Sequence, residues 1–303
     1  MGGAEEERMT FLFSGRKEWN GKKKEIILRG ILCVFALIPA IILIILFSYI
    51  FSNGISAINI DFLLNSPYML ERGGIFPQII GSLCLVSVCL LFAVPLGVLS
   101  AIYLAEYAPD NALTGIIRFF VECLAGIPSI VIGLFGLILL VHYLNFGISL
   151  LSGGLSLGFM ILPWTIRASE EAIRAVPRSF REASLALGAT KLQTIRCVVL
   201  RNAFPGIITG VLLGLGKALG ETAVVLLTAG SGLESFIPRS LFDPVGSLPV
   251  YIYMLATQGR HSSTAFSKAS GASLVLLTIF FAINVSALLL RNRYIRRMRG
   301  EIA

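Results

Sequence analysis

Long uninterrupted runs of apolar residues dominate the chain, and polar segments separate them. Six such runs cover residues 26–51, 75–104, 119–141, 146–166, 203–229 and 266–290. Each has the length of about 20 residues or more that a helix needs to cross a bilayer. The runs far exceed the roughly 10-residue alternating strands of an outer-membrane barrel. The pattern therefore predicts an all-α integral membrane protein with six transmembrane helices.

The composition agrees with a membrane location. Of the 303 residues, 56% are hydrophobic and only 14% are charged, and the mean hydropathy is +0.85. Soluble domains carry about 25% charged residues, so a water-soluble fold of this size could not bury so much apolar surface. The first run is too long for the apolar part of a signal peptide, and no small-residue cleavage pattern follows it. We expect it to stay in the protein as the first membrane helix.

The basic residues flank the apolar runs, and their distribution predicts the topology. A net charge of +8 could suggest nucleic acid, but basic clusters next to membrane helices are typical of topology signals, so we expect no nucleic-acid partner. The predicted outer loops hold only Arg72, Arg239 and Arg260. The predicted inner segments hold Lys22, Lys23, Lys24, Arg167, Arg174, Arg178, Arg181, Lys191, Arg196, Arg201, Arg291, Arg293, Arg296, Arg297 and Arg299. The positive-inside rule therefore places both termini in the cytoplasm.

The sequence predicts three parts: a cytoplasmic tail over 1–25, a transmembrane domain over 26–290 and a basic cytoplasmic tail over 291–303. Gly126 and Pro128 are candidates for a break in the third apolar run, as is Pro95 in the second.

No arrangement of residues predicts catalysis or a metal site in this chain. The five cysteines lack metal-ligand spacing, and His142 and His261 are far apart in sequence. The stretch "VLLGLGKA" approaches a P-loop, but Val211 stands at the first glycine position, Ala218 at the Ser/Thr position, and no strand precedes it. We expect no catalytic residue, no metal ligand and no nucleotide site, so the chain is not an enzyme by itself.

The polar segment 167–202 predicts two short helices joined by a turn. Pro177 suits the first turn of a helix that continues to about residue 187, and Gly188 suits the left-handed conformation that ends it. Thr190 with Gln193 three residues later is a capping box for a second helix. Such a helix-turn-helix with its own apolar side would either dock on a partner or pack under the membrane bundle.

Two charged residues stand inside the fifth apolar run. Lys217 lies roughly 20 Å along it at about 1.5 Å per residue, near or just beyond the middle of the membrane. A charge there costs about 2.5–3.5 kcal/mol on insertion scales and faces a bundle interior or an aqueous path. Glu221 is four residues later, so on one continuous helix the two would share a face. They are either a structural ion pair or, as we favour, part of a transport path together with Thr222. Closely spaced glycines, including Gly206, Gly210 and Gly214, predict a central position for this helix.

Several motifs resemble a known family of membrane proteins. The stretch Glu182, Ala183, Ser184 with Gly188 four residues further on resembles the EAA loop of ABC-importer permeases. In this chain Ser184 stands where the motif has a second alanine, and Arg201 stands where it ends with proline. The stretches "LAGIPSIVIGLFGL", "GKALGETA" and "LFDPVGSLPVYIYMLAT" are similar to phosphate-importer permeases, and the last favours the PstA type over the paralogous PstC type.

The resemblance implies the fold of a type I ABC-importer permease in a prokaryotic inner membrane. It implies that the loop seats a short coupling helix in a cleft of an ATPase, with the residues Glu182, Ala183, Ser184, Gly188, Ala189 and Thr190. The implied partners are a PstC-type permease, two PstB-type ATPases that bind ATP and magnesium, and an external PstS-type phosphate-binding protein. The family commonly has arginine at the position of Lys217. Lysine keeps the positive charge but lacks the bidentate fork of arginine.

Alternatives remain open at this level. The substrate could be another oxyanion such as sulfate or molybdate, the chain could be the PstC-type paralogue, and the permease core could pair this chain with itself. A membrane scaffold is the alternative outside transport, and it would have no ATPase partner.

Overall fold

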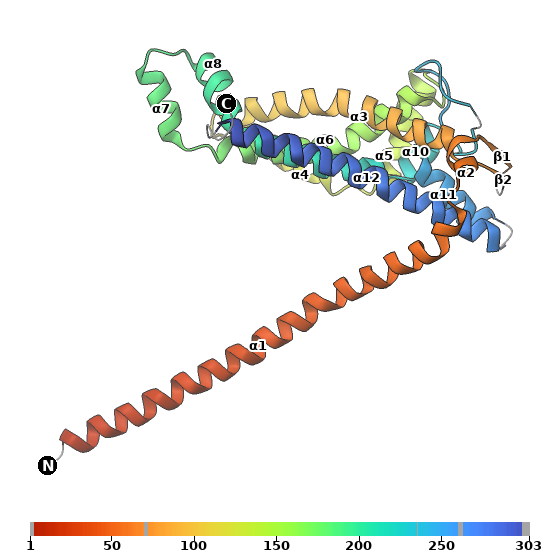
Figure 1. The fold of residues 1–303 in the computed structure, drawn as a ribbon. Coiled ribbons are helices and arrows are strands. Elements are labelled where there is room, and N and C mark those ends of the chain that lie inside the picture. The colour runs from red at the N-terminus through yellow and green to blue at the C-terminus, as the bar shows by residue number, and fades with distance from the viewer. Residues whose placement is uncertain (1–2, 70–71, 235, 260–262, 299–303) are drawn as a thin grey trace. The chain divides into compact units, whose positions relative to one another are not determined.

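The computed structural model describes residues 3–69, 72–234, 236–259 and 263–298, and these are helical apart from one short hairpin and the connecting segments (Figure 1). Arg260, His261 and the end of the C-terminal tail lie outside the described residues. The chain divides into two compact units, Met1–Ser52 and Asn53–Ala303. Among the described residues, five helices are long and apolar enough to cross a membrane, or six if one bent pair counts as a single span.

The first unit consists of one long helix. Helix α1 runs over Gly3–Gly54 and includes the predicted span 26–51 as well as most of the predicted tail over 1–25. Nearly all described side chains of the apolar part are exposed, as expected for a helix whose surroundings are lipid tails. Pro39 lies inside this helix without ending it.

The second unit is built around helix α6, Leu150–Arg174. Helix α3 (Phe76–Ile102) packs along it, and Pro95 does not interrupt α3. Helix α9 (Leu200–Leu219) also packs against α6. Helix α12 (Ser263–Met298) contacts α9 and α11 (Leu248–Gln258). The prediction of a span at 75–104 is confirmed. The predicted spans 146–166 and 266–290 are confirmed as helices with shifted ends, so the helix of the last span continues into the predicted tail.

The third predicted span, 119–141, is wrong as a single straight helix. Helix α4 (Ala112–Ala125) ends at a break, and helix α5 (Ser129–Gly136) follows and continues as the π-helix η3 (Leu137–Tyr143). The two parts are bent by 98° at this break. The break falls at Gly126 and Pro128, as the sequence suggested. The cause is that the residue before a proline is disfavoured in the helical region.

The fifth predicted span, 203–229, is also wrong as one helix. Helix α8 (Lys191–Gln193), the π-helix η4 (Thr194–Val199) and α9 form one continuous span from Lys191 to Leu219. The helix therefore begins well before the predicted start. It ends at a break over Gly220, Glu221 and Thr222, and the short helix α10 (Ala223–Thr228) follows.

The two ends of the second unit differ in structure (Figure 1). One end carries helix α7 (Arg178–Ala186) and α8. The other carries the 3₁₀ turn η1 (Ile55–Ala57), helix α2 (Ile60–Leu64) and the antiparallel hairpin of β1 (Pro67–Met69) and β2 (Arg72–Gly73).

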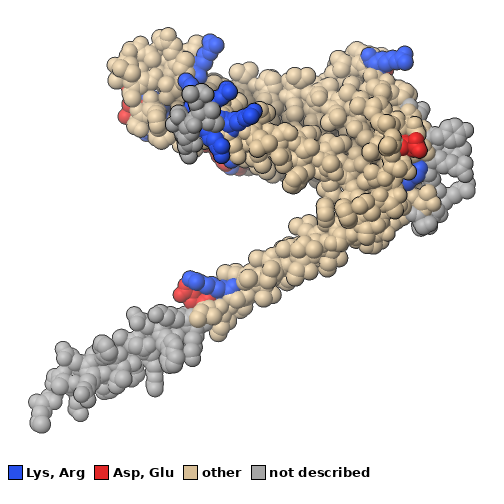
Figure 2. All heavy atoms as spheres, viewed as in Figure 1, with Lys and Arg blue, Asp and Glu red and all other residues tan. Residues whose placement is uncertain are grey.

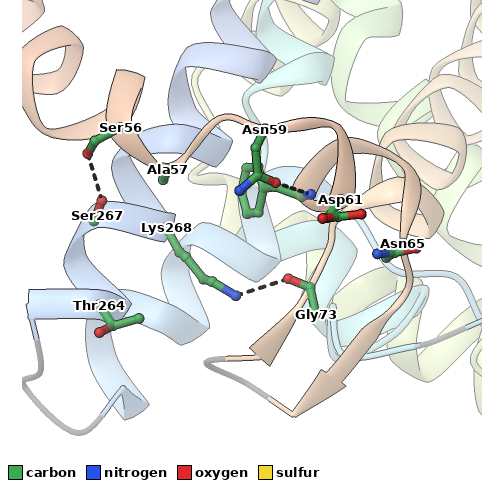
Figure 3. A pocket seen from close by; sticks show the side chains of 10 residues that line it. Ser56, Ala57, Asn59, Asp61, Asn65, Gly73, Thr264, Ser267 and Lys268 are labelled. Atoms are coloured by element: carbon green, nitrogen blue, oxygen red, sulfur yellow. Dashed lines mark hydrogen bonds between the residues drawn. The ribbon is translucent and has the colours of Figure 1, made fainter.

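A polar cavity of about 570 Å³ opens at the hairpin end. Lys268 of α12 donates a hydrogen bond to the carbonyl oxygen of Gly73 at 3.0 Å, and Asn59 caps α2 through the backbone N–H of Phe62 (Figure 3). Asp61 and Asn65 lie on the same wall of this cavity.

Small residues let α9 approach α6 closely, which agrees with the predicted central position of α9. A Cβ added at Gly206 would lie 2.7 Å from Cβ of Ala172, and one added at Gly210 would collide with Ala168. Without a hydrophobic driving force in lipid, such close backbone packing is a main source of helix association.

We predict that Gly210→Leu separates α9 from α6 and lowers the free energy of unfolding in detergent by about 1–3 kcal/mol, the usual cost of overpacking. Gly30→Leu in α1 is the control, because nothing lies within 4 Å of a Cβ added there. The unfolding temperatures of the two purified variants measure this difference. Equal unfolding temperatures for Gly210→Leu and Gly30→Leu would contradict the packing between α9 and α6.

Candidate functional site

Lys217 lies on an exposed face in the last turn of α9. Its ammonium Nζ is 4.8 Å from the ring centre of Trp164 on α6, within the range of a cation–π contact. Trp164 is the fifteenth of the 25 residues of α6, so Lys217 lies at the level of the middle of that span. Both side chains are open to the surroundings in the single chain, with Trp164 45% exposed.

The sequence left an ion pair between Lys217 and Glu221 open as the alternative to a transport path, and this pair is not formed among the described residues. A shared face required one continuous helix, but α9 ends at Leu219, before Glu221. Glu221 instead accepts a hydrogen bond from the backbone N–H of Ala223 at 3.2 Å. The carboxylate therefore caps the start of α10, while Thr222 is the half-buried residue that precedes it.

The segments that follow the two broken helices pack on each other. A Cβ at Gly133 of α5 would lie 3.1 Å from Cα of Val224, at the start of α10. One at Gly136 would lie 3.0 Å from the methyl group of Thr228, at its end. The two short helices therefore run in the same direction, with their preceding breaks on the same side. Irregular backbone at membrane depth is tolerated only where protein covers it or water reaches it.

The predicted turn between two short helices is confirmed between α7 and α8. Gly188 ends α7 with a φ of +83°, which a residue with a side chain rarely adopts. Thr190 and Gln193 form the reciprocal capping box, with hydrogen bonds of 2.8 and 3.3 Å. The hydroxyl groups of Ser184 and Thr194 lie 2.9 Å apart and join the two helices.

Helix α7 presents its side chains to the surroundings instead of packing under the bundle. It contains no buried residue, Glu182 and Ala183 are exposed, and Ala189 in the following turn is half-buried. Leu187 is 89% exposed and Leu192 is 67% exposed, which is unusual for leucines in a water-exposed loop. We name the exposed apolar side chains of this loop the coupling-loop surface, made of Phe180, Leu185, Leu187 and Leu192.

Charged pairs that the sequence did not indicate hold this end together. Glu170 of α6 is almost fully buried, and it accepts from Nε of Arg118 at 2.9 Å and lies 3.1 Å from Nε of Arg174. Arg181 of α7 bonds to Glu106 at 2.7 Å, across 75 residues of sequence. Buried pairs of this kind need several bonds to offset the loss of hydration.

Two further findings bear on chemistry. Among the described residues, no group of three His, Cys, Asp or Glu side chains is placed to hold a metal ion. All five cysteines are free thiols.

The sequence of this chain matches a known protein family. Residues 93–300 match the model of the family described as binding-protein-dependent transport system inner membrane component. The chain is 37% identical to the Probable ABC transporter permease protein YqgI of Bacillus subtilis (strain 168), over 88% of this chain and 95% of that protein. It is 36% identical to the Phosphate transport system permease protein PstA of Haemophilus influenzae, over 78% of this chain and 82% of that protein.

A third relative and one solved structure point the same way. The Phosphate transport system permease protein PstA 1 of Mycobacterium tuberculosis (strain H37Rv) is 38% identical, over 75% of this chain and 72% of that protein. The fold is similar to a crystal structure of a bacterial ABC transporter involved in the import of alginate, with a TM-score of 0.62 at 17% identity. That likeness covers 91% of this chain and 99% of the matched chain.

We predict that Glu170→Gln destabilises the protein by about 1.5–3 kcal/mol, because the charge-assisted bonds of a buried carboxylate to two guanidinium groups are lost. Glu171→Gln is the matched control, since this neighbouring carboxylate is 74% exposed and 3.8 Å from Arg167. Its loss should cost at most about 1 kcal/mol. Equal unfolding temperatures for both variants in detergent would show that the buried pair contributes no more than the exposed one.

Proposed function

The chain belongs to the family of binding-protein-dependent transport system inner membrane components, and from this premise we propose that it is the PstA-type permease subunit of an ATP-driven phosphate importer. The names of its relatives support phosphate as the substrate, and the fold is that of an ABC-importer permease. The observation that carries the assignment of a path is the exposed ammonium of Lys217 at mid-membrane depth, beside a broken helix.

Lys217 belongs on an aqueous path because lipid cannot solvate it. A charged side chain at the membrane centre costs several kcal/mol unless water, protein or substrate surrounds it. In the described part of this chain its contact is one indole ring and no carboxylate. The face that carries Lys217 therefore borders either the path or the second permease, and a positive charge on a path attracts an anion.

Glu221 and Thr222 add selectivity at the same break. The carboxylate that caps α10 retains oxygen lone pairs that can accept a hydrogen bond from a protonated phosphate. Fully ionised sulfate has no proton to donate. A carboxylate near the path also weakens the hold of Lys217 on an anion, which favours release.

The coupling-loop surface is the proposed contact with an ATPase subunit. Its exposed leucines lie in α7, in the turn after it and in α8, and the half-buried Arg181 of α7 anchors this loop to Glu106. ATP and magnesium are bound by two PstB-type ATPases, and this chain supplies no nucleotide site and no catalytic residue. The relatives are transport permeases, which supports this division of labour.

The proposed orientation places α7, α8 and both termini in the cytoplasm of a prokaryotic cell. On the face shown in Figure 2, Lys and Arg gather at the α7–α8 end of the second unit, as the positive-inside rule requires. The hairpin end with its polar cavity then faces outward, where a PstS-type binding protein delivers phosphate. A PstC-type permease completes the path, and the two halves alternate between outward- and inward-facing states.

We predict that Lys217→Met abolishes ATP-dependent uptake of labelled phosphate by cells that lack their own importer and express this chain with its partner subunits. The neutral side chain removes the attraction for the anion. Lys217→Arg is the control, because it retains the charge and should retain uptake. Glu221→Gln should lower the preference for phosphate over sulfate.

Membrane levels of the assembled complex must be equal in all strains for this comparison. Normal uptake by Lys217→Met would make the residue structural and leave the permease assignment intact. An assembled wild type that carries sulfate or molybdate instead of phosphate would overturn the substrate.

We predict that Leu187→Ser weakens binding of the ATPase subunit about tenfold, because a buried leucine contributes about 1.5–3 kcal/mol. Ala186→Ser at the neighbouring position, the last residue of α7, removes little apolar area and is the control. The amount of ATPase that co-purifies across a dilution series measures the affinity. A scaffold without an ATPase partner would retain no ATPase in either case.

A further inference from the structure

Basic side chains from three separate elements converge on one short segment at the end of α3. This segment is the π-helix η2, Tyr103–Tyr107. Arg181 of α7 reaches Glu106, Arg118 of α4 reaches the carbonyl oxygen of Leu104 at 3.0 Å, and Lys191 of α8 lies 4.5 Å from the ring centre of Tyr107. The segment therefore contacts both helices of the coupling loop and the first half of the bent helix.

The contact between Arg181 and Glu106 is the strongest of the three. Two guanidinium nitrogens bond to the same carboxylate oxygen, at 3.0 and 2.7 Å. The side chains are 20% and 10% exposed, so water screens the pair only weakly. A charge-assisted contact with two bonds fixes direction as well as distance.

Arg181 also holds its own helix in place through a separate set of bonds. Its guanidinium donates to the carbonyl oxygens of Ile173 and Val176, at the turn between α6 and α7. These bonds orient α7 locally. The bond to Glu106 is the one that connects α7 to the end of α3.

The connection continues from η2 to the bent helix. Arg118 joins Leu104 to Glu170 and so ties α4 to both α3 and α6. Helix α4 leads to the break before α5, and α5 packs on α10, directly after Glu221. Single π turns inside helices occur frequently at functional sites, because their wider ring breaks the regular bonding of the helix. The bond from Ala108 N–H to the Tyr103 oxygen, at 2.8 Å, closes this ring.

We propose that Glu106 and Arg181 are positioning residues that transmit movement of the coupling loop through η2 to the bent helix α4–α5, and so link ATP hydrolysis to opening of the path. This inference rests on the proposed function. The relay runs from α7 through the Arg181–Glu106 pair to η2, and from Leu104 through Arg118 to α4. A contact that served stability alone would leave this transmission unchanged when weakened.

The test uses the complete importer, reconstituted in liposomes with its binding protein, as wild type, Glu106→Gln or Arg178→Gln. Glu106→Gln keeps the carbonyl bonds of Arg181 and removes only the charged contact. Arg178 is the matched control, because it lies on α7 together with Arg181 and lines the same cavity of about 470 Å³ as Glu106. We expect Glu106→Gln to hydrolyse ATP while the phosphate carried per ATP falls about fivefold or more, the usual scale of coupling between sites. Arg178→Gln should match the wild type.

A second readout follows α4 directly. Cys123 is an exposed thiol on α4. In a chain with the other four cysteines replaced by serine, ATP should change the rate at which a soluble thiol reagent labels Cys123. Glu106→Gln should abolish this response, and Arg178→Gln should keep it.

The relay is overturned if Glu106→Gln keeps both the wild-type ratio and the ATP response of Cys123, or only lowers the unfolding temperature. It is also overturned if Cys123 of the wild type does not respond to ATP. Hydrolysis without phosphate uptake by the wild type would instead refute the proposed substrate, and labelling of Cys123 would still decide the relay.

Discussion

The rest of the structure depends on one constraint, which is that backbone polar groups inside a membrane must be satisfied by protein or water. Two helices of this chain nevertheless break, at Gly126–Pro128 and at Gly220–Thr222. The breaks are sustained because the segments that follow them, α5 and α10, pack on each other through glycines. Glu221 caps one of them, and Lys217 stands one turn before it. The irregular backbone and the fixed charge thus occupy the same region.

Helix α6 holds the remaining elements in place around that region. It contacts α3, α9, α4, α5 and α10, and it uses two kinds of interaction. Small residues along its length, from Gly153 to Ala172, allow close approach of its neighbours, and buried Glu170 near its end also binds arginines. Close packing drives helix association in lipid, and charge-assisted bonds add direction at the charged end. A rigid centre and a charged end suit a subunit that receives movement at one end.

Local patterns were predictable from the sequence, and contacts between distant residues were not. The long apolar runs at 26–51 and 75–104 form helices, and Gly188 with the box of Thr190 and Gln193 forms the expected turn, since these features depend on neighbouring residues alone. The runs at 119–141 and 203–229 are mostly apolar, so hydropathy did not reveal their breaks, although Gly126 and Pro128 indicated the first one. The assumption of one continuous fifth helix left open an ion pair between Lys217 and Glu221 that the described residues do not form. Contacts such as Arg181 with Glu106 join residues 75 positions apart, and a single sequence carries no signal for them.

The central claim is that the amine of Lys217 faces the aqueous path and acts through its charge. The most direct measurement is uptake of labelled phosphate by an importer whose five native cysteines are replaced and whose Lys217 is changed to cysteine. We predict that this variant is inactive, that 2-aminoethyl methanethiosulfonate restores uptake by attaching a new amine, and that the negatively charged 2-sulfonatoethyl reagent does not. Labelling that restores nothing, or equal uptake with either reagent, would contradict the account.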